Sequence, residues 1–335
     1  MQHVMTIKTD HQHWTPERFL EDWRIYLQDH DHAVGTVKKY TQAISLFLAW
    51  YEQEEQTPLT LSAFTPIALI GYRNELQHEQ QKSMSTINLR ISALRAWCAW
   101  LVDQGYLVAD PAVRIKLVSG EAGSKREGLS STQVNALLRQ AQTSRDPERN
   151  YAILQVLLQT GIRLSECSRL TYGDITFGER SGTLLVRAGK GNKVRSVPLN
   201  ASARDALAIC VGPHLDIEKV SLKAVTAKWP KPKSSHTFDP LFLSQKGGKL
   251  TTSAMGQMIA ELVKAAGELV PEETSAHYLR HTFAQSYLTQ YPSDLVGLAT
   301  LLGHSSLDTT RLYSQPSTVQ LAMRVEHFSL NAYSR

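Results

Sequence analysis

The chain contains little cysteine: three residues in 335, Cys98, Cys167 and Cys210. They lie far apart, are odd in number and lack the short spacings of zinc ligands, so the sequence indicates neither a disulfide framework nor a structural metal site. We therefore expect three reduced thiols in a cytoplasmic protein.

Long apolar runs are also absent. No stretch approaches the roughly 18 consecutive apolar residues that a membrane-spanning helix requires. Residues 1–10 contain no apolar segment after a basic one, as a secretory signal would. The sequence thus predicts no membrane partner. The His/Asp groups at residues 11–13 and 29–32 lie at expected helix margins and are interpreted as solvated residues rather than metal ligands.

Charge is modest and unevenly distributed. The net charge is +5, but residues 1–120 hold 11 Lys/Arg and 13 Asp/Glu, whereas residues 121–335 hold 25 and 18. The balance is therefore −2 in the first part and +7 in the second. This asymmetry favours the second part as the one that faces a polyanion.

A length of 335 residues favours two domains. Residues 15–116 carry apolar side chains at helical spacing, with helices expected to begin near Thr15, Gly35, Thr65 and Ser83. Four helices with short connections predict a small bundle. Residues 117–128 lack periodicity and are rich in small and charged residues, so they predict a linker.

Residues 129–335 mix helical and strand patterns. A helix cap is expected at residues 130–133, and a buried helix over 151–160 ends at Gly161. Residues 183–186 and 194–199, around a turn at 189–192, predict a hairpin. The Lys/Pro/Ser-rich segment 212–237 is expected to be a surface excursion. The predicted fold class is mainly α with a small β-sheet: a helical domain followed by an α+β domain.

Basic residues recur near helix ends in this second domain. Arg163 follows the glycine-terminated helix, and Arg280 lies three residues after His277 near a helix start. Arginine can grip two phosphate oxygens at once, and helix N-termini favour anions. Taken singly, Arg163 also fits a surface ion pair and Arg280 a charge on a helix face. With the lone Tyr313 further along, the combination favours attack of a tyrosine on a phosphodiester.

Four motifs occur in order. They are Thr-Gly-x-Arg-x-Ser-Glu at 160–166, Gly-Lys-Gly-Asn-Lys-x-Arg-x-Val-Pro-Leu at 189–199, His-x-Leu-Arg-His-Thr-Phe-Ala at 277–284 and Leu-Gly-His-x-Ser-x-x-Thr-Thr-x-x-Tyr at 302–313. Together they resemble the tyrosine recombinase (phage integrase) family, especially its Xer-like and transposon- or integron-type members.

The resemblance implies a domain organisation. Residues 15–116 would form a four-helix, SAM-like core-binding domain, residues 117–128 a linker, and residues 129–335 a tyrosine-recombinase catalytic domain with a C-terminal tail. The likeness over the first domain is limited to its helical pattern, whereas the second domain matches in all four motifs.

The resemblance also implies which residues transfer protons and make the covalent bond. Tyr313 would attack the scissile phosphate, which leaves a 3′-phosphotyrosine and a free 5′-hydroxyl. His277 would be the general base for this attack. Lys190 would protonate the departing 5′-oxygen as general acid, with Lys193 as the local competitor.

The remaining implied roles concern the phosphate. Arg163 and Arg280 would stabilise its pentavalent transition state, and His304 would hydrogen-bond it. Glu166 would support the site by positioning the first arginine. Because the covalent bond conserves the energy of the phosphodiester, religation is expected to require no ATP. The arginines and the lysine would neutralise the charge that a metal neutralises in two-metal nucleases, so no metal or other cofactor is expected.

The implied partners are a double-stranded DNA recombination site and three further copies of the chain. The resemblance predicts a homotetramer on two DNA sites, with strands exchanged pairwise through a Holliday junction. Whether accessory DNA-binding proteins take part, and whether the tail docks on its own or a neighbouring subunit, stays open. In the first domain the resemblance predicts residues that contact DNA, although the same residues fit an ordinary polar helix face equally well. They are Thr36, Lys38, Lys39, Tyr40, Ser85, Thr86, Asn88, Arg90 and Arg95.

Two other functions fit parts of this pattern. A type IB topoisomerase would use similar chemistry to relax DNA, but the separate helical domain and the spacing from Leu302 to Tyr313 favour a recombinase. A catalytically silent DNA-binding protein on the same fold would lack at least one catalytic group. All six are present, namely Arg163, Lys190, His277, Arg280, His304 and Tyr313.

Overall fold

The computed structural model describes residues 15–30, 32–119, 127–187, 194–230, 234–304 and 310. The chain divides into two compact units, Met1–Ser124 and Lys125–Arg335, here the N-terminal and C-terminal units. Each has a hydrophobic core of its own. Among the described helices, none is both long and apolar enough to cross a lipid bilayer.

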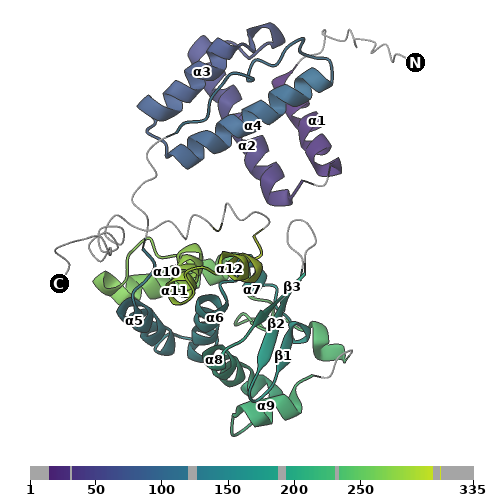
Figure 1. Cartoon of the computed structure of the whole chain (residues 1–335). Coiled ribbons are helices and arrows are strands. Elements are labelled where there is room, and N and C mark those ends of the chain that lie inside the picture. Colours follow the sequence, from purple (N-terminus) through teal and green to yellow (C-terminus); the bar gives the residue numbers. More distant parts are fainter. Residues whose placement is uncertain are drawn as a thin grey trace, which may run out of the picture. The chain divides into compact units, whose positions relative to one another are not determined.

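The N-terminal unit contains the four expected helices (Figure 1). Helix α2 packs against the other three, and Phe47 on α2 is fully buried between rings such as Tyr72 and Phe64. Hydroxyl caps begin two helices: the Thr65 side chain accepts the amide of Ala68, and Ser83 that of Thr86. The helices are α1 (Pro16–Asp29), α2 (Val34–Glu55), α3 (Pro66–Asn74) and α4 (Met84–Asp103).

Helix α6 forms the centre of the C-terminal unit. It packs against α5, α7, α8 and α11, and residues 152–158 are buried on all sides, because six of these seven residues are apolar. Helices α6 and α8 lie between α5 and the sheet (Figure 1). The helices of this unit are α5 (Ser131–Gln142), α6 (Pro147–Thr160), α7 (Leu164–Cys167), α8 (Ala201–Val211), α9 (Leu222–Lys228), α10 (Thr252–Ala266), α11 (Ala276–Gln290) and α12 (Leu295–Leu302).

The sheet has three antiparallel strands in the order β1–β2–β3. Strands β2 (Gly182–Val186) and β3 (Arg195–Pro198) confirm the two arms of the predicted hairpin. The turn with Lys190 and Lys193 lies outside the described residues. Strand β1 (Ile175–Phe177) was not expected, because three residues are too few to show an alternating pattern.

The expectation of a surface excursion over 212–237 was wrong in part. Residues 222–228 form α9, whose Val225 is fully buried. Trp229 then packs against Tyr172 and Phe177, with ring centroids 5.1 and 4.8 Å away, and donates a hydrogen bond to the Ile175 carbonyl at 3.1 Å. Two large apolar side chains thus anchor a segment whose overall composition is polar.

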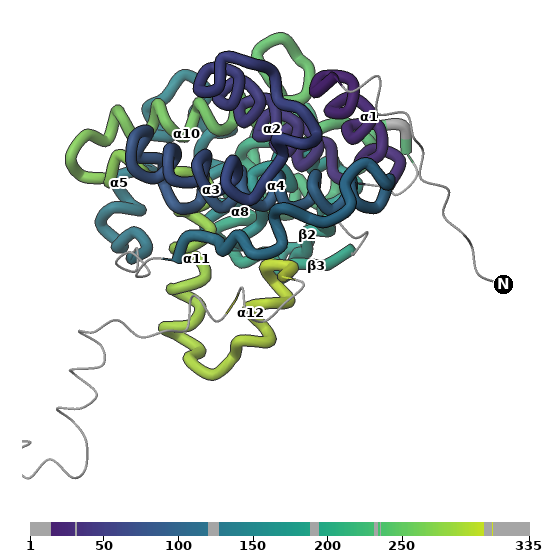
Figure 2. Tube along the Cα trace, turned by 90° about the horizontal axis from the view of Figure 1, so that it is seen from above, coloured from purple at the N-terminus to yellow at the C-terminus, as the bar shows by residue number. Residues whose placement is uncertain are grey.

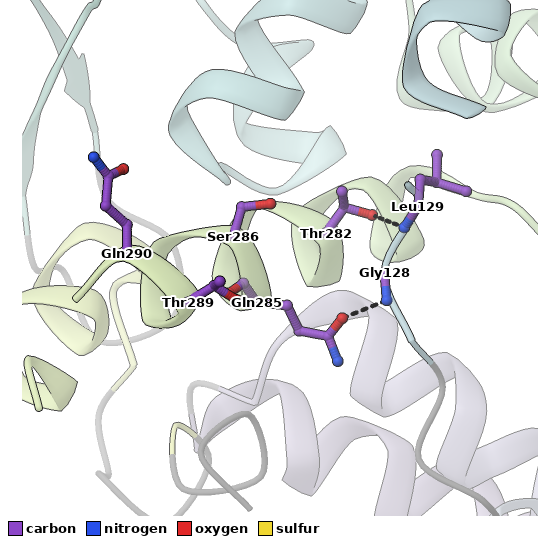
Figure 3. Close-up of a pocket in the computed structure, with 7 residues that line it drawn as sticks. All are labelled: Gly128, Leu129, Thr282, Gln285, Ser286, Thr289 and Gln290. Atoms are coloured by element: carbon purple, nitrogen blue, oxygen red, sulfur yellow. Dashed lines mark hydrogen bonds between the residues drawn. The ribbon is translucent and has the colours of Figure 1, made fainter. Parts of the chain in front are cut away.

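The first described residues of the C-terminal unit, Glu127–Leu129, run along α11 and are called the entry strap (Figure 3). The Tyr278 hydroxyl donates to the Glu127 carbonyl at 2.7 Å, and the Leu129 amide donates to the Thr282 hydroxyl at 2.9 Å. The Gly128 amide donates to Gln285. A Cβ on Gly128 would lie 2.8 Å from the Cα of Thr282, so the close approach requires glycine.

Helices α11 and α12 form a hairpin that extends to one side of its unit (Figure 2). It has a small apolar cluster of its own, which includes Ala284, Leu288, Leu298 and Leu302. Helix α12 also contacts β3. The contact of α12 with β3 therefore links the sheet to α11, the other helix of the hairpin, which begins at Ala276.

Candidate active site

Arg163 lies between α6 and α7, two residues after the glycine that ends α6. Gly161 adopts a left-handed conformation (φ 63°) and ends the helix. The Arg163 side chain is 47% exposed, whereas that of Glu166, with which it pairs at 3.0 Å, is 3% exposed. The ion pair of Arg163 with Glu166 that the alternative interpretation expected is therefore present, but only its arginine reaches the surface, because the carboxylate is buried.

Glu166 is joined to the sheet by a second arginine. Arg195 on β3 binds its carboxylate at two points, 3.0 Å to Oε1 and 2.7 Å to Oε2. Burial alone would raise the pKa of Glu166, but hydrogen bonds from Arg195 and from the Arg163 amide, together with both positive charges, hold it below its usual value. Glu166 therefore stays ionised at neutral pH.

Arg280 is buried, with 4% of its surface exposed. It donates to the carbonyl of Gly161 at 2.6 Å and to that of Leu302 at 2.8 Å, which lie at the C-terminal ends of α6 and α12. Each helix C-terminus carries the equivalent of about half a negative charge, so two of them stabilise a buried cation. The alternative of a charge on an exposed helix face is excluded by this burial.

His304 lies beside Arg280 just beyond the end of α12. Arg280 donates to Nε2 at 3.0 Å, and Nδ1 lies 2.8 Å from the Thr310 hydroxyl. Because arginine can only donate, Nε2 is the acceptor and the neutral ring carries its proton on Nδ1. Burial, followed by the charges of Arg280, Arg163, Arg195 and His277, lowers the pKa of His304 to about 4.

Of the other three predicted catalytic residues, the structure describes only His277. His277 is the second residue of α11, is exposed, and is close enough to influence the charge on His304. Lys190 and Tyr313 lie outside the described residues. The structure thus brings together four of the six, namely Arg163, His277, Arg280 and His304.

Arg195 received no role from the sequence, although it lies within the second motif. Its side chain is 12% exposed, and its Nε also donates to the Leu301 carbonyl at 2.9 Å. A signal was present: in β3, Arg195 shares the inward face with the buried Val197, where alternation normally places an apolar residue.

These residues form a positively charged cluster suited to a phosphate group. Three arginines and His277 act on His304, two of these arginines pair with Glu166, and the Arg163 side chain, half exposed, can reach a ligand from solvent. Within the part of the chain that the structure describes, no cluster of three or more His, Cys, Asp or Glu could hold a metal ion. The cavity of about 370 Å³ beside the entry strap is separate, since its described lining includes no basic side chain (Figure 3).

In the N-terminal unit the predicted DNA contacts differ in exposure. Asn88 exchanges hydrogen bonds with the backbone of Val118 at 2.8 and 3.0 Å, and Arg90 donates to the Tyr72 hydroxyl at 3.1 Å. Both therefore already have partners within their own unit. Of the others, Thr36, Tyr40 and Thr86 are half-buried, and Lys38, Lys39, Ser85 and Arg95 are exposed.

Comparison with known families accounts for this arrangement. The Phage integrase family matches residues 127–319, and the Phage integrase, N-terminal SAM-like domain matches residues 20–105. These matches define a DNA strand-breaking and rejoining enzyme, and the chain belongs to the phage integrase family. It is a tyrosine recombinase, which makes the topoisomerase and the silent DNA-binding protein the disfavoured alternatives.

Similar proteins agree in sequence and in fold. Tyrosine recombinase XerC of Oceanobacillus iheyensis is 30% identical over 89% of this chain and 91% of its own length. XerC of Bacillus subtilis is 29% identical over 88% and 91%. Two solved structures share the fold: a XerH recombinase bound to difH DNA (TM-score 0.68, 22% identity, 94% and 85% covered), and a Tn1549 transposon integrase bound to transposon-end DNA (0.68, 20%, 93% and 99%).

Proposed function

We propose that the cluster formed by Arg163, Arg280 and His304 binds the scissile phosphate of a DNA recombination site. The observation that carries this assignment is the buried Arg280, which is held by two helix C-termini and contacts His304 at 3.0 Å. Preorganised donors of this kind need not reorient when charge develops on the phosphate. Arg163 supplies the half-exposed cation that completes the contact.

In the proposed reaction the Tyr313 oxygen attacks phosphorus and the bond to the 5′-oxygen breaks. His277 accepts the tyrosine proton, and Lys190 donates a proton to the departing oxygen. The phosphate remains attached to Tyr313 until the 5′-hydroxyl of another strand reverses the step. An entering phosphate also offsets the arginine charges around His304, which favours a protonated ring that donates to the phosphate.

The assembly is proposed from the same family. The domains at 15–116 and 129–335, joined by 117–128, would enclose double-stranded DNA, with Lys38, Lys39 and Arg95 on phosphates. Four copies on two DNA sites would exchange strands in pairs, with or without accessory DNA-binding proteins. The proposed location is the cytoplasm, where bacterial DNA is accessible. In support, the solved XerH structure contains its difH substrate, and the solved Tn1549 integrase structure contains transposon right end DNA.

The nucleophile can be tested once a site has been recovered. The full-length Tyr313→Phe protein is used to select binding fragments from genomic DNA. The recovered sequence is then synthesised as a duplex nicked next to the cleavage point, so that the released fragment diffuses away and the covalent complex accumulates. We expect wild type to form this complex under denaturing electrophoresis and Tyr313→Phe to form none. A covalent complex with Tyr313→Phe would refute the assignment.

The same assay tests the cofactor prediction. The proposed chemistry uses arginine, lysine and histidine in the positions that metal ions occupy in two-metal nucleases. We therefore expect EDTA to leave the yield of covalent complex unchanged. A requirement for added magnesium would contradict this mechanism.

The Tyr313→Phe comparison has a matched control. Tyr291→Phe removes the hydroxyl of a half-exposed tyrosine in the same unit and should form the covalent complex as wild type does.

A further inference from the structure

We propose that Arg195 is a positioning residue of the cleavage reaction. It neutralises Glu166, so that Arg163 is left for the phosphate, and it fixes the end of the helix that precedes His304. This inference rests on the proposed function, because it assumes that Arg163 and His304 contact the scissile phosphate. In this proposal Arg195 itself does not contact DNA.

The first part follows from the hydrogen bonds of Glu166. Its carboxylate accepts four: two from the Arg195 guanidinium, one from the Arg163 guanidinium and one from the Arg163 amide, at 2.7 to 3.0 Å. A carboxylate offers about four acceptor positions, so all of them are used. If the Arg163 guanidinium moves to a phosphate, Glu166 keeps three donors and its full counter-charge.

Without Arg195 the balance changes. Glu166 is buried, and an uncompensated buried carboxylate is strongly disfavoured. The cation left beside it would be Arg163, which is already 3.0 Å away. Arg163 would then be held by Glu166 rather than offered to the phosphate. The charge that Arg195 contributes is therefore what makes Arg163 available.

The second part follows from the other end of the Arg195 side chain. Its Nε donates to the Leu301 carbonyl at 2.9 Å, next to the Leu302 carbonyl that Arg280 binds. Two arginines thus satisfy adjacent carbonyls at the end of α12, which lack partners within the helix. Gly303 follows in a left-handed conformation (φ 65°), and a Cβ there would lie 2.6 Å from the Arg195 guanidinium. This packing sets the position from which His304 emerges.

The test compares Arg195→Met with Arg195→Lys on the nicked duplex described above. Each variant is assayed for DNA affinity and, at saturating DNA, for the rate of covalent complex formation. A displacement of about 1 Å in a catalytic group can cost about 100-fold in rate, so we expect Arg195→Met to cleave about 100-fold more slowly with unchanged affinity. Arg195→Lys keeps the charge but not the fork and should lie between it and wild type.

A matched control separates positioning from general stability. Arg149, at the start of α6, also pairs with a carboxylate (Asp146, 2.9 Å) and donates to a carbonyl (Leu243, 3.0 Å), with 18% of its side chain exposed. It lies at the opposite end of α6 from Gly161, roughly 18 Å away along the helix. We expect Arg149→Met to lose stability but to cleave at the wild-type rate.

The double variant Glu166→Gln with Arg195→Met provides a readout that a purely structural role would not change. Compared with Glu166→Gln alone, the double variant should lose less rate than Arg195→Met loses compared with wild type, because no carboxylate remains to be neutralised. The double variant also has no uncompensated buried carboxylate, so it folds even if Arg195→Met alone does not. Wild-type cleavage by Arg195→Met, an equal loss in Arg149→Met, or an equal cost in both Glu166 backgrounds would overturn the inference. A covalent complex with Tyr313→Phe would instead overturn the proposed function and leave these comparisons standing.

Discussion

The titration of His304 couples the site to folding stability. Its pKa is lowered from 6.5 to about 4 in the folded chain by burial and by Arg280, Arg163, Arg195 and His277. The unfolded chain therefore binds more protons between these values, and stability is lost as pH falls from 6.5 towards 4. The pKa of Glu166 is also lowered, but its contribution is lost only below its ordinary value of 4.5.

We expect this effect to be measurable by urea denaturation. Between pH 7 and pH 5 the free energy of unfolding should fall more for wild type than for His304→Gln, which cannot titrate. Since other histidines are present in both proteins, the difference between the two pH profiles isolates His304. Identical profiles would show that His304 is not held neutral by its neighbours.

Single residues of the site also show what the sequence could reveal. Arg163, Arg280 and His304 were predictable because they stand in motifs with fixed spacing. The burial of Arg280 was not, since it depends on carbonyls 119 and 22 residues away in the chain. The role of Arg195 was hidden for the same reason: its partners on α7 and α12 are brought to β3 only by folding.

At the scale of elements, helices were easier to predict than strands. The helices of the N-terminal unit follow apolar periodicity, and α1, α3 and α4 begin at hydroxyl or proline residues, which are local signals. Strand β1 and the docking of α9 depend on contacts such as Trp229 with Phe177, 52 positions apart in the chain, and no local pattern reports these. Short elements are specified mainly by what they pack against.

The entry strap gives a prediction at this scale. Thr282→Val removes the acceptor of the buried Leu129 amide, and an unsatisfied buried donor costs about 1–3 kcal/mol. Thr289→Val on the same helix is the control, because its hydroxyl is exposed and bonds only within α11. Urea denaturation should show a clear loss for Thr282→Val and little change for Thr289→Val. Equal stabilities would mean that the strap is not held by this bond.

At the scale of the molecule, the two separate cores predict separate responses to a core mutation. Leu94 on α4 is buried in the N-terminal unit, and Leu→Ala at such a position costs about 2–5 kcal/mol. Of the six tryptophans, only Trp229 belongs to the C-terminal unit. In a Trp229→Phe background, fluorescence therefore reports the N-terminal unit alone.

We expect Leu94→Ala in that background to lower the unfolding midpoint seen by fluorescence. Hydrogen exchange of the α6 amides, which reports the C-terminal unit, should keep its wild-type protection. A parallel loss of α6 protection would show that the units unfold as one. The experiment thus measures whether the division into two units is also a division in stability.

The entry strap has a practical consequence for replacing the N-terminal unit by that of another protein. Glu127 and Gly128, which the sequence assigned to the linker 117–128, are bonded together with Leu129 along the helix that contains His277 and Arg280, so the C-terminal unit holds all three residues. A chimaeric protein whose junction lies upstream of Glu127 would keep the hydrogen bonds between the entry strap and α11. A chimaera joined a few residues later would place a foreign backbone along α11 and would lose the bonds to the helix that contains His277 and Arg280.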